Sequence, residues 1–341
     1  MPANLTPEFK AAEAACRKAR DPRERLEWLR EMLRTIPKHK GTDHLQADIK
    51  TRIKELTEEL AGPKKGGSRG GPATVIRPEG AAQIALLGPP NSGKSSLHAR
   101  LTGSNAQTGP YPFTTRVPQP GMLPYQDIYL QLIDLPPLTQ DRPIPWLRNA
   151  LQPADACLLV VDLGDPACVE HVMTIHDLLA EKGVTLAERW DEEPVAAGDS
   201  GEELARLFAV RLPTLMIASK ADQIPALAEE LEVFRELTGW RYPVLAVSVV
   251  TGEGLDRIGP WLFDRLGVVR VYTKAPGRPP DRDRPFTVRR GQTVRDVAML
   301  VHRDMGQSLK YARLWGGGQF SGQQVGPEHP VADGDVVELH T

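Results

Sequence analysis

A short glycine-rich segment follows an apolar run that ends at Leu87 and precedes a helix-like stretch, and its residues suit the binding of phosphate. Glycines allow successive backbone N–H groups to point at phosphate oxygens, Lys94 supplies a positive charge for the outer phosphates, and the Ser95 hydroxyl can ligate Mg²⁺. A plain glycine-rich turn would not explain the lysine followed by serine. The pattern therefore predicts a nucleoside triphosphate site, formed by Gly88, Pro89, Pro90, Asn91, Ser92, Gly93, Lys94, Ser95 and Ser96.

A second polar segment, Ser219-Lys220-Ala221-Asp222, follows another apolar run and indicates which base is bound. A buried Asp222 carboxylate can accept two hydrogen bonds from the N1 and N2 donors of guanine, whereas adenine offers no such pair of donors. The Lys220 stem can lie over the ring face. The segment is similar to the guanine-specificity motif of GTPases, although a solvated turn could carry the same residues. Because Ser219 replaces the usual Asn or Thr, we expect a weaker tie to the phosphate loop.

The loop from Gly109 to Val117 contains two threonines. A threonine here could complete the Mg²⁺ shell and order the loop when the terminal phosphate is present. With its two prolines and its aromatic pair, the loop looks like the switch loop of the Obg-related GTPases, whose second threonine is the one linked to the metal. This resemblance favours Thr115 over Thr114, and a plain loop at a sheet edge is the alternative.

Asp134 follows a further apolar strand and can hold Mg²⁺ through water as a second metal-site oxygen ligand. The expected Mg²⁺ ligands are therefore Ser95, Thr115 and Asp134. The residues expected to take part in catalysis are Lys94, Thr115 and Asp134.

The residues after Asp134 depart from the pattern of GTPases at Pro137. The usual residue is glycine, whose N–H binds the γ-phosphate, and proline has no N–H to offer. One hydrogen bond to a charged oxygen contributes about 1.5 to 3 kcal/mol, so we expect discrimination between GTP and GDP to fall roughly tenfold or more. Leu138 stands where Ras-like enzymes carry the glutamine that orients water. The proline-rich stretch 138–145 predicts a loop that is stiffer than usual.

Two assignments stay open. Asn91 matches the asparagine that helps potassium-stimulated GTPases to hold a K⁺ between the phosphates, but it could equally cap the turn of the loop. Ser248 and Val249 follow the last expected strand of the nucleotide domain and resemble the loop whose backbone N–H reaches the guanine O6. A plain connection from a strand to a helix would have the same composition.

The composition describes an ordinary protein of 341 residues with a formal charge of −2, so whole-chain charge indicates nothing about nucleic acid. Three scattered cysteines are too few for a disulfide framework or a zinc cluster, which favours a reducing cytoplasm. The N-terminus has no apolar run behind basic residues, and no stretch reaches the roughly 18 apolar residues that span a bilayer, so we expect neither export nor a membrane segment. His171 and His176 are five residues apart on an expected helix, which does not suit a metal pair.

Shifts in composition divide the chain into parts. An N-terminal arm, 1–61, is expected to fold as a helical hairpin, and 62–80 is a basic, flexible linker. Residues 81–267 alternate short strands with helical stretches, as in a mostly parallel α/β sheet covered on both faces, with 183–211 as an insertion that we interpret as part loop and part helix. Residues 268–341 form a further domain. The expected strands of the α/β domain are 84–87, 128–133, 156–161, 215–218 and 244–247.

The order of these motifs, the loop at 109–117 and the arm segment 34–44 resemble the DRG (developmentally regulated GTP-binding) branch of the Obg-related GTPases. The segments 271–274, 310–316 and 333–339 look like the TGS domain, a β-grasp module that closes DRG proteins. The resemblance implies a P-loop GTPase that binds GTP or GDP and acts with ribosomes or RNA through its arm and TGS domain. The basic residues that could contact RNA, or form only a solvated face, are Lys38, Lys40, Lys64, Lys65 and Arg69.

Two hypotheses about function follow from these residues. In the first, the protein is a slow Mg²⁺-dependent GTPase in which water attacks the γ-phosphate, while a bound K⁺ or a regulatory protein partner supplies the missing stabilisation. In the second, the protein is a ribosome- or RNA-binding scaffold that holds the nucleotide with little or no hydrolysis, because Pro137 has removed the γ-phosphate contact. Lys94, Ser95 and Asp222 favour nucleotide binding in both cases.

Overall fold

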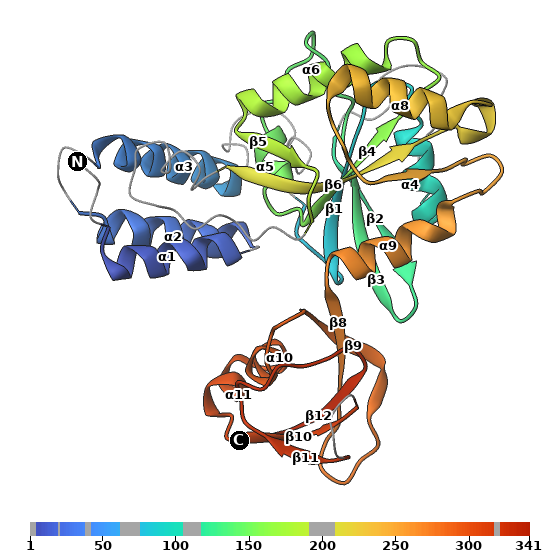
Figure 1. The fold of residues 1–341 in the computed structure, drawn as a ribbon. Coiled ribbons are helices and arrows are strands. Elements are labelled where there is room, and N and C mark those ends of the chain that lie inside the picture. The colour runs from blue at the N-terminus through green and yellow to red at the C-terminus, as the bar shows by residue number, and fades with distance from the viewer. Residues whose placement is uncertain are drawn as a thin grey trace.

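A computed structural model of the chain describes residues 5–19, 21–37, 42–61, 76–104, 117–190, 209–316 and 321–341. Three parts follow one another along the chain, as Figure 1 shows: a group of N-terminal helices, a larger domain in which helices cover a central sheet, and a small C-terminal domain with its own sheet. This arrangement confirms the expected α/β fold with N-terminal helices and a second, smaller β-domain.

The strands of the larger domain form a seven-stranded sheet in the order β2-β3-β1-β4-β6-β5, and β7 also pairs with β6. All neighbours are parallel except β2 and β3. The five expected strands are all present, as β1, β3, β4, β6 and β7. The strands are β1 (Ala82–Leu87), β2 (Gln119–Tyr125), β3 (Ile128–Asp134), β4 (Ala156–Val161), β5 (Val184–Ala187), β6 (Val210–Ala218) and β7 (Val244–Ala246).

Two strands were not predicted, and both lie at edges of the sheet. Strand β2 contains Pro120 and Pro124, which lower its strand propensity but are tolerated in an edge strand that pairs only with β3. Strand β5 pairs with the first half of β6, where Val184 lies opposite Val210, and β7 pairs with the second half of β6. The interpretation of 183–211 as loop and helix is therefore wrong for its first and last residues, which belong to the sheet.

Alternate side chains of the central strands point into two separate hydrophobic layers, because successive residues of a strand face opposite sides. Leu87 and Leu159 lie in the layer beneath α6 and α8, whereas Leu86 and Leu158 lie in the layer beneath α4 and α9. Figure 1 shows α6 and α8 at the top of this domain and α4 and α9 at its right-hand side. The helices of this domain are α4 (Lys94–Thr102), α5 (Leu147–Leu151), α6 (Cys168–Glu181), α8 (Leu227–Thr238) and α9 (Ile258–Arg265).

The described residues of the N-terminal arm form three helices where the sequence predicted two: α1 (Pro7–Lys18), α2 (Pro22–Thr35) and α3 (Asp43–Ala61). The predicted hairpin corresponds to α2 and α3, and α1 packs against α2. Thr6 caps α1 by accepting a hydrogen bond from the Phe9 N–H, with proline at the first helical position. Asp21 and Pro22 begin α2 in the same way. A capping residue followed by proline is a signal for the start of a helix, so α1 could have been predicted from the sequence. The helices share a core that includes Phe9, Met32 and Ile49.

The C-terminal domain has a five-stranded sheet in the order β11-β10-β12-β8-β9. Its first helix, α10, begins at Val294, and the side chain of the preceding Thr293 forms a capping box with Asp296. The domain docks on the β2–β3 hairpin, because Arg270 and Tyr272 both donate hydrogen bonds to Asp127. The elements are β8 (Val268–Thr273), β9 (Asp281–Arg289), α10 (Val294–Val301), α11 (Arg303–Ser308), β10 (Tyr311–Trp315), β11 (Gln323–Val325) and β12 (Asp335–His340).

Candidate nucleotide-binding site

The predicted phosphate loop connects the end of β1 to the start of α4 at Lys94. A Cβ at Gly88 would lie 2.4 Å from the carbonyl oxygen of Val160, so only glycine fits at this position. Asn91 and Gly93 have left-handed backbones, with φ of 61° and 82°. They turn the chain sharply into α4, whose first N–H groups and positive dipole end suit a phosphate.

Asn91 therefore has a structural role in the turn, since asparagine tolerates the left-handed conformation better than most residues. Its side chain is exposed. A role as a K⁺ ligand is compatible with this position and stays a prediction.

Lys94, Ser95 and Asp134 come together at the carboxyl ends of β1 and β3. The Lys94 Nζ lies 3.0 Å from Asp134 Oδ1, and the Ser95 Oγ donates a 2.6 Å hydrogen bond to Asp134 Oδ2. Only 5% of the Lys94 side chain and 1% of the Asp134 side chain are exposed. The two strands are parallel neighbours in which Leu86 is paired with Asp134, and this register brings distant parts of the sequence together.

The chemistry of this cluster fits Mg²⁺. A serine hydroxyl and a carboxylate are hard oxygen donors, which Mg²⁺ prefers, and it binds through few protein ligands with water and phosphate as the others. Ser95 and Asp134 already share one hydrogen bond, so both oxygens face the same point. Among the described residues there is no group of three or more His, Cys, Asp or Glu that could hold a metal ion by itself.

The segment after Asp134 is buried as a whole, from Leu135 through Leu138. Leu135 is fully buried and Leu138 is 4% exposed, and both belong to the hydrophobic layer beneath α6. Pro137 lies between these two anchors. Leu135 and Leu138 anchor the chain around Pro137, whereas the stiffness expected of residues 138–145 stays a prediction.

Ser219 ties the base segment to the phosphate loop, and the expectation that this tie is weaker than one made by Asn or Thr stays a prediction. The Ser219 Oγ donates a 2.7 Å hydrogen bond to the carbonyl oxygen of Ser92, and it lies 3.1 Å from the carbonyl oxygen of Val161. Ser219 is 3% exposed, so this contact is shielded from water. The short serine side chain succeeds because β6 and β4 are adjacent and their carboxyl ends lie close to the loop.

Lys220 is held by a residue that the sequence analysis did not single out. Its Nζ donates a 2.7 Å hydrogen bond to Asp162 Oδ2, which follows the last residue of β4. The sequence contained a signal for this residue, because Asp162 is a carboxylate directly after an expected strand. Ligands bind at the carboxyl ends of strands in such sheets. Lys220 has a left-handed backbone, with φ of 54°.

Asp222, the residue predicted to read guanine, lies in the short 3₁₀ helix η1 (Ala221–Gln223) directly after β6. Its side chain is exposed rather than buried, which differs from the prediction. The difference arises because η1 projects beyond the sheet edge, where Asp222 can face a base from outside the core. Strand β7 lies beside η1, since the Ala221 N–H donates a 3.1 Å hydrogen bond to the carbonyl oxygen of Val247.

Ser248 and Val249 form the start of the loop after β7, next to this segment. Ser248 is fully buried, and its Oγ accepts a 3.1 Å hydrogen bond from the N–H of Thr251. Its backbone N–H donates to the carbonyl oxygen of Glu253 within the same loop. The Ser248 side chain thus shapes the loop, and Val249 is half-buried against the layer beneath α9.

The segment that contains Thr114 and Thr115 lies outside the described residues, as does most of the Gly109 to Val117 loop. The structure therefore brings together the phosphate-loop, metal and base residues, namely Lys94, Ser95, Asp134, Ser219, Lys220, Asp222 and Ser248. No helix in the described part of the chain is long and apolar enough to cross a membrane.

Comparison with known proteins agrees with this geometry. Residues 83–189 match the family described as 50S ribosome-binding GTPase, and residues 269–341 match the TGS domain. The Developmentally-regulated GTP-binding protein 1 of Xenopus laevis is 26% identical, and the alignment covers 91% of this chain and 96% of that protein. The chain thus combines a GTPase domain with a TGS domain, and its relatives along most of its length are DRG proteins.

Further relatives of this DRG-like protein match it along most of its length. Developmentally-regulated G-protein 2 of Arabidopsis thaliana is 27% identical over 91% of this chain and 88% of its own length. A GTP-binding protein of Methanocaldococcus jannaschii is 26% identical over 93% of this chain and 92% of its own length. The solved YchF GTPase of Schizosaccharomyces pombe covers 77% of this chain with a TM-score of 0.51 at 15% identity, which shows a shared fold.

Proposed function

We propose that this DRG-like protein binds guanine nucleotides and hydrolyses GTP slowly to GDP and phosphate in the presence of Mg²⁺. The observation that carries the proposal is the cluster of Lys94, Ser95 and Asp134 at the phosphate loop, in which the lysine and the carboxylate are buried. A buried lysine and a buried carboxylate need a chemical reason, because their desolvation is costly. Binding a phosphate on one side and a divalent cation on the other would supply that reason.

The residues of the cluster would divide the work of phosphoryl transfer. Ser95 and Asp134 would hold the Mg²⁺, with Thr115 as a further ligand, and the metal would neutralise charge on the outer phosphates. The Lys94 ammonium would turn from Asp134 to phosphate oxygens, which the flexible lysine stem permits. The backbone N–H groups from Asn91 to Ser96 would donate to the remaining oxygens, since Pro89 and Pro90 have no N–H.

Guanine would be read at the edge formed by the ends of β6 and β7. Asp222 would accept hydrogen bonds from the base, while Asp162 fixes the Lys220 stem on which the ring would lie. The backbone at Ser248 and Val249 would approach the guanine O6. Ser219 supports this reading because its bond to the Ser92 carbonyl oxygen fixes the distance between base and phosphate positions.

Slow hydrolysis follows from the residues after Asp134. Pro137 has no N–H for the γ-phosphate, and Leu138 is buried in the core and carries no group that could orient water. A K⁺ held near Asn91, or a partner protein, would have to stabilise the developing charge. The same observation favours the second candidate function, a scaffold that holds a nucleotide without turnover.

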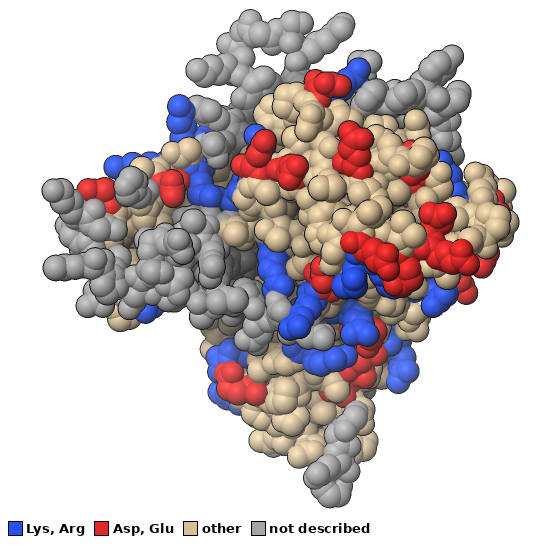
Figure 2. Space-filling view, turned by 45° about the horizontal axis from the view of Figure 1, so that its top comes forward, with Lys and Arg blue, Asp and Glu red and all other residues tan. Residues whose placement is uncertain are grey.

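Ribosomes or RNA are the partners that we propose for the arm and the TGS domain. The match to the TGS domain and to a ribosome-binding GTPase family supports this part of the proposal. In Figure 2, basic and acidic side chains are interspersed over the face in view, with neither sign covering a wide area. On this face, a defined contact therefore fits better than a broad phosphate-binding surface.

A single-turnover GTP hydrolysis assay tests the proposal. It is run with K⁺ or Na⁺, with and without ribosomes, and with Lys94→Ala as the inactive reference. We expect turnover above that reference, faster with K⁺ or with ribosomes. If no condition exceeds Lys94→Ala while the wild-type protein still binds GDP, the scaffold function replaces the enzyme function.

A further variant, Pro137→Gly, tests the account of slow hydrolysis. It restores an N–H at the γ-phosphate position, so we expect GTP to bind roughly tenfold or more tightly relative to GDP. Pro137→Ala is the matched control, because it also restores the N–H but adds less backbone freedom than glycine. Unchanged relative affinity in both variants would contradict the role assigned to Pro137.

A further inference from the structure

The five-stranded sheet of the TGS domain carries helices on one face, and its other face has a different character. Val271, Leu314 and Val337 point to the helix side, where they share a core with Val294 of α10. Because successive residues of a strand face opposite sides, the residues between these positions lie on the other face. From β8, β10, β12 and the residue that follows β8, they are Arg270, Tyr272, Lys274, Tyr311, Arg313, Trp315, Val336, Glu338 and His340.

One buried carboxylate on this face holds side chains from the neighbouring strands in place. Glu338 is 4% exposed and lies on β12, between β10 and β8. The Lys274 Nζ lies 3.0 Å from Glu338 Oε2, and the His340 Nε2 lies 2.8 Å from Glu338 Oε1. The Lys274 ammonium also lies 4.1 Å from the centroid of the Trp315 ring. The His340 ring is stacked on Tyr311, with centroids 4.5 Å and planes 9° apart. The rings are therefore organised by the fold.

The rings on this face remain partly exposed, which makes them available to a ligand. Tyr311, Trp315 and His340 are all half-buried. Flat rings held on an open sheet are a surface on which proteins stack the bases of a single strand, since every base has a π-face. A duplex hides those faces within its own stack, so the surface favours single-stranded RNA. Tyr311 and Trp315 are four residues apart on β10, roughly 14 Å, which leaves room for a few nucleotides.

The charge of this face is complementary to the phosphates of such a strand. Arg313 is exposed between the two rings of β10, and Lys310 is exposed directly before this strand. Among the described residues that face this side from β8, β10 and β12, Glu338 is the single carboxylate, and Lys274 balances its charge. Arg313 and Lys310 therefore give the surface a net positive charge, which suits phosphate contacts beside the stacked bases.

We propose that this face binds a short segment of single-stranded RNA, with a base stacked on the ring pair of Tyr311 and His340 and phosphates near Arg313 and Lys310. Glu338 is a positioning residue, because it fixes the rings and does not face the strand. The inference rests on the proposed role of RNA as a partner. It adds the surface, the single-stranded state of the RNA and the residues that hold it.

Strand β3 separates this surface from the nucleotide site. Asp127, directly before β3, accepts a hydrogen bond from Tyr272 at one margin of the surface. Asp134, the last residue of β3, lies in the nucleotide site. A strand of seven residues spans roughly 23 Å. RNA can therefore bind while GDP and Mg²⁺ occupy the nucleotide site, and the two kinds of binding can be measured independently.

Fluorescence anisotropy with a short fluorescein-labelled RNA of mixed sequence tests the proposal. The full chain is first saturated with GDP and Mg²⁺. We expect Tyr311→Ala to weaken binding of the single strand roughly fivefold or more, because it removes a stacking ring. Tyr311→Phe keeps the ring and should bind as the wild-type protein does, so a loss in Tyr311→Ala alone is not a loss of folding. Arg313→Gln should weaken binding and reduce the slope of log K against log salt by about 0.7.

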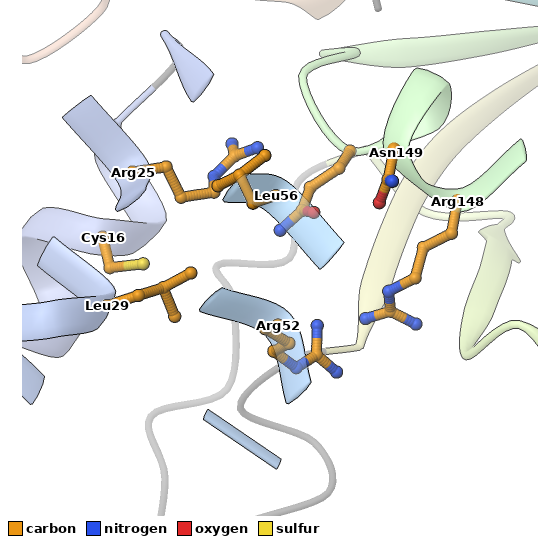
Figure 3. Close-up of a pocket in the computed structure, with 8 residues that line it drawn as sticks. Cys16, Arg25, Leu29, Arg52, Leu56, Arg148 and Asn149 are labelled. Carbon is orange, nitrogen blue, oxygen red and sulfur yellow. The ribbon is translucent and has the colours of Figure 1, made fainter. Parts of the chain in front are cut away.

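Two control variants test whether the RNA binds elsewhere on the protein. Tyr129→Ala removes a tyrosine that is 55% exposed on β3, in the α/β domain. Arg52→Gln removes a charge from a second group of basic side chains, around the small cavity between the arm and the α/β domain. In Figure 3, Arg52 and Arg148 point toward each other at this cavity. Both controls should bind the single strand as the wild-type protein does.

The outcomes separate this inference from the proposed function. Unchanged affinity in both Tyr311→Ala and Arg313→Gln would overturn the inference, as would an equal loss in Arg52→Gln and Arg313→Gln. Equal affinity for the single strand and for a duplex of the same sequence would also overturn it, because a duplex offers no free base to stack. If the wild-type protein sediments with ribosomes but does not bind the single strand, the surface is wrong and the proposed partner stands. Binding of GDP by every variant shows that the nucleotide site is intact.

Discussion

The ion pair between Lys94 and Asp134 allows a quantitative test of how the phosphate site is held together. The Nζ to Oδ1 distance is 3.0 Å, and 5% and 1% of the two side chains are exposed, so each charge depends on the other. Removal of one partner of a buried pair costs about 3 to 5 kcal/mol, because the remaining charge is left without compensation. In Lys94→Met the Ser95 hydroxyl still donates to Asp134, which places the cost near the lower limit, about 3 kcal/mol.

For a domain of this size, each kcal/mol lowers the melting temperature by about 2 to 4 °C, so Lys94→Met should lower it by about 6 to 12 °C. Asp134→Asn removes the carboxylate charge at nearly constant volume. In Lys94→Met/Asp134→Asn neither charge remains, and we expect the double variant to be about 2 kcal/mol more stable than the sum of the single effects predicts.

Thermal and urea unfolding of nucleotide-free protein in EDTA measure these differences. A second cycle on the exposed pair Glu31 and Arg34 is the matched control, and its coupling should lie within experimental error. If the effects of Lys94→Met and Asp134→Asn add to within about 0.5 kcal/mol, the two charges do not support each other and the reasoning is refuted.

Three further changes test other contacts of the described residues. Ser219→Ala leaves the Ser92 carbonyl oxygen without its donor, so it should lower the free energy of unfolding by about 1 to 2 kcal/mol and weaken GDP binding. Ser219→Thr keeps the hydroxyl and is the control. Equal GDP affinity of the two variants would contradict this prediction. Asp162→Asn removes the ion pair that holds the Lys220 side chain, so it should weaken guanine nucleotide binding by about two- to fivefold. The difference between variant and wild type should become smaller in high salt, because salt screens the ion pair. A loss of affinity that does not change with salt would contradict this prediction. Burial lowers the pKa of His176 to about 4, so the unfolded state takes up a proton first and stability should fall as the pH drops from about 6.5 toward 4. Melting temperatures of His176→Gln should fall less over that range, and parallel curves would disprove the assignment.

Much of the fold could be predicted because local patterns and packing agree. The central strands β1, β4 and β6 are continuous apolar runs, as buried parallel strands must be, and all were found. The two edge strands were missed for different reasons. Strand β2 contains prolines that lower its strand propensity, and β5 is a four-residue strand whose partner lies beyond a long insertion. Edge strands are specified by what they pair with, and that information is not local.

The site was predictable to the extent that each residue type is tied to one chemistry. A lysine and serine after a glycine-rich turn indicate phosphate and metal, and the register of β1 and β3 explains why Asp134 joins them. The role of Ser219 could not be read from its type, because a short hydroxyl ties two loops only if their backbones are already close. Asp162 could have been noticed as a carboxylate directly after β4, but its contact with Lys220 could not be predicted, because only the sheet order creates it.

These contacts differ in whether they can persist when a nucleotide is bound. The bond from Ser219 to the Ser92 carbonyl oxygen and the pair of Lys220 with Asp162 can persist when a base is bound, so the base side is already organised. The pair of Lys94 with Asp134 cannot persist unchanged, because the same ammonium must reach phosphate oxygens. The carboxylate released by that movement needs a new counter-charge, and Mg²⁺ is the group that fits its oxygens. Under the proposed function, phosphate and metal would therefore enter together, and affinity for the nucleotide would depend on Mg²⁺ through Asp134 rather than through the base contacts.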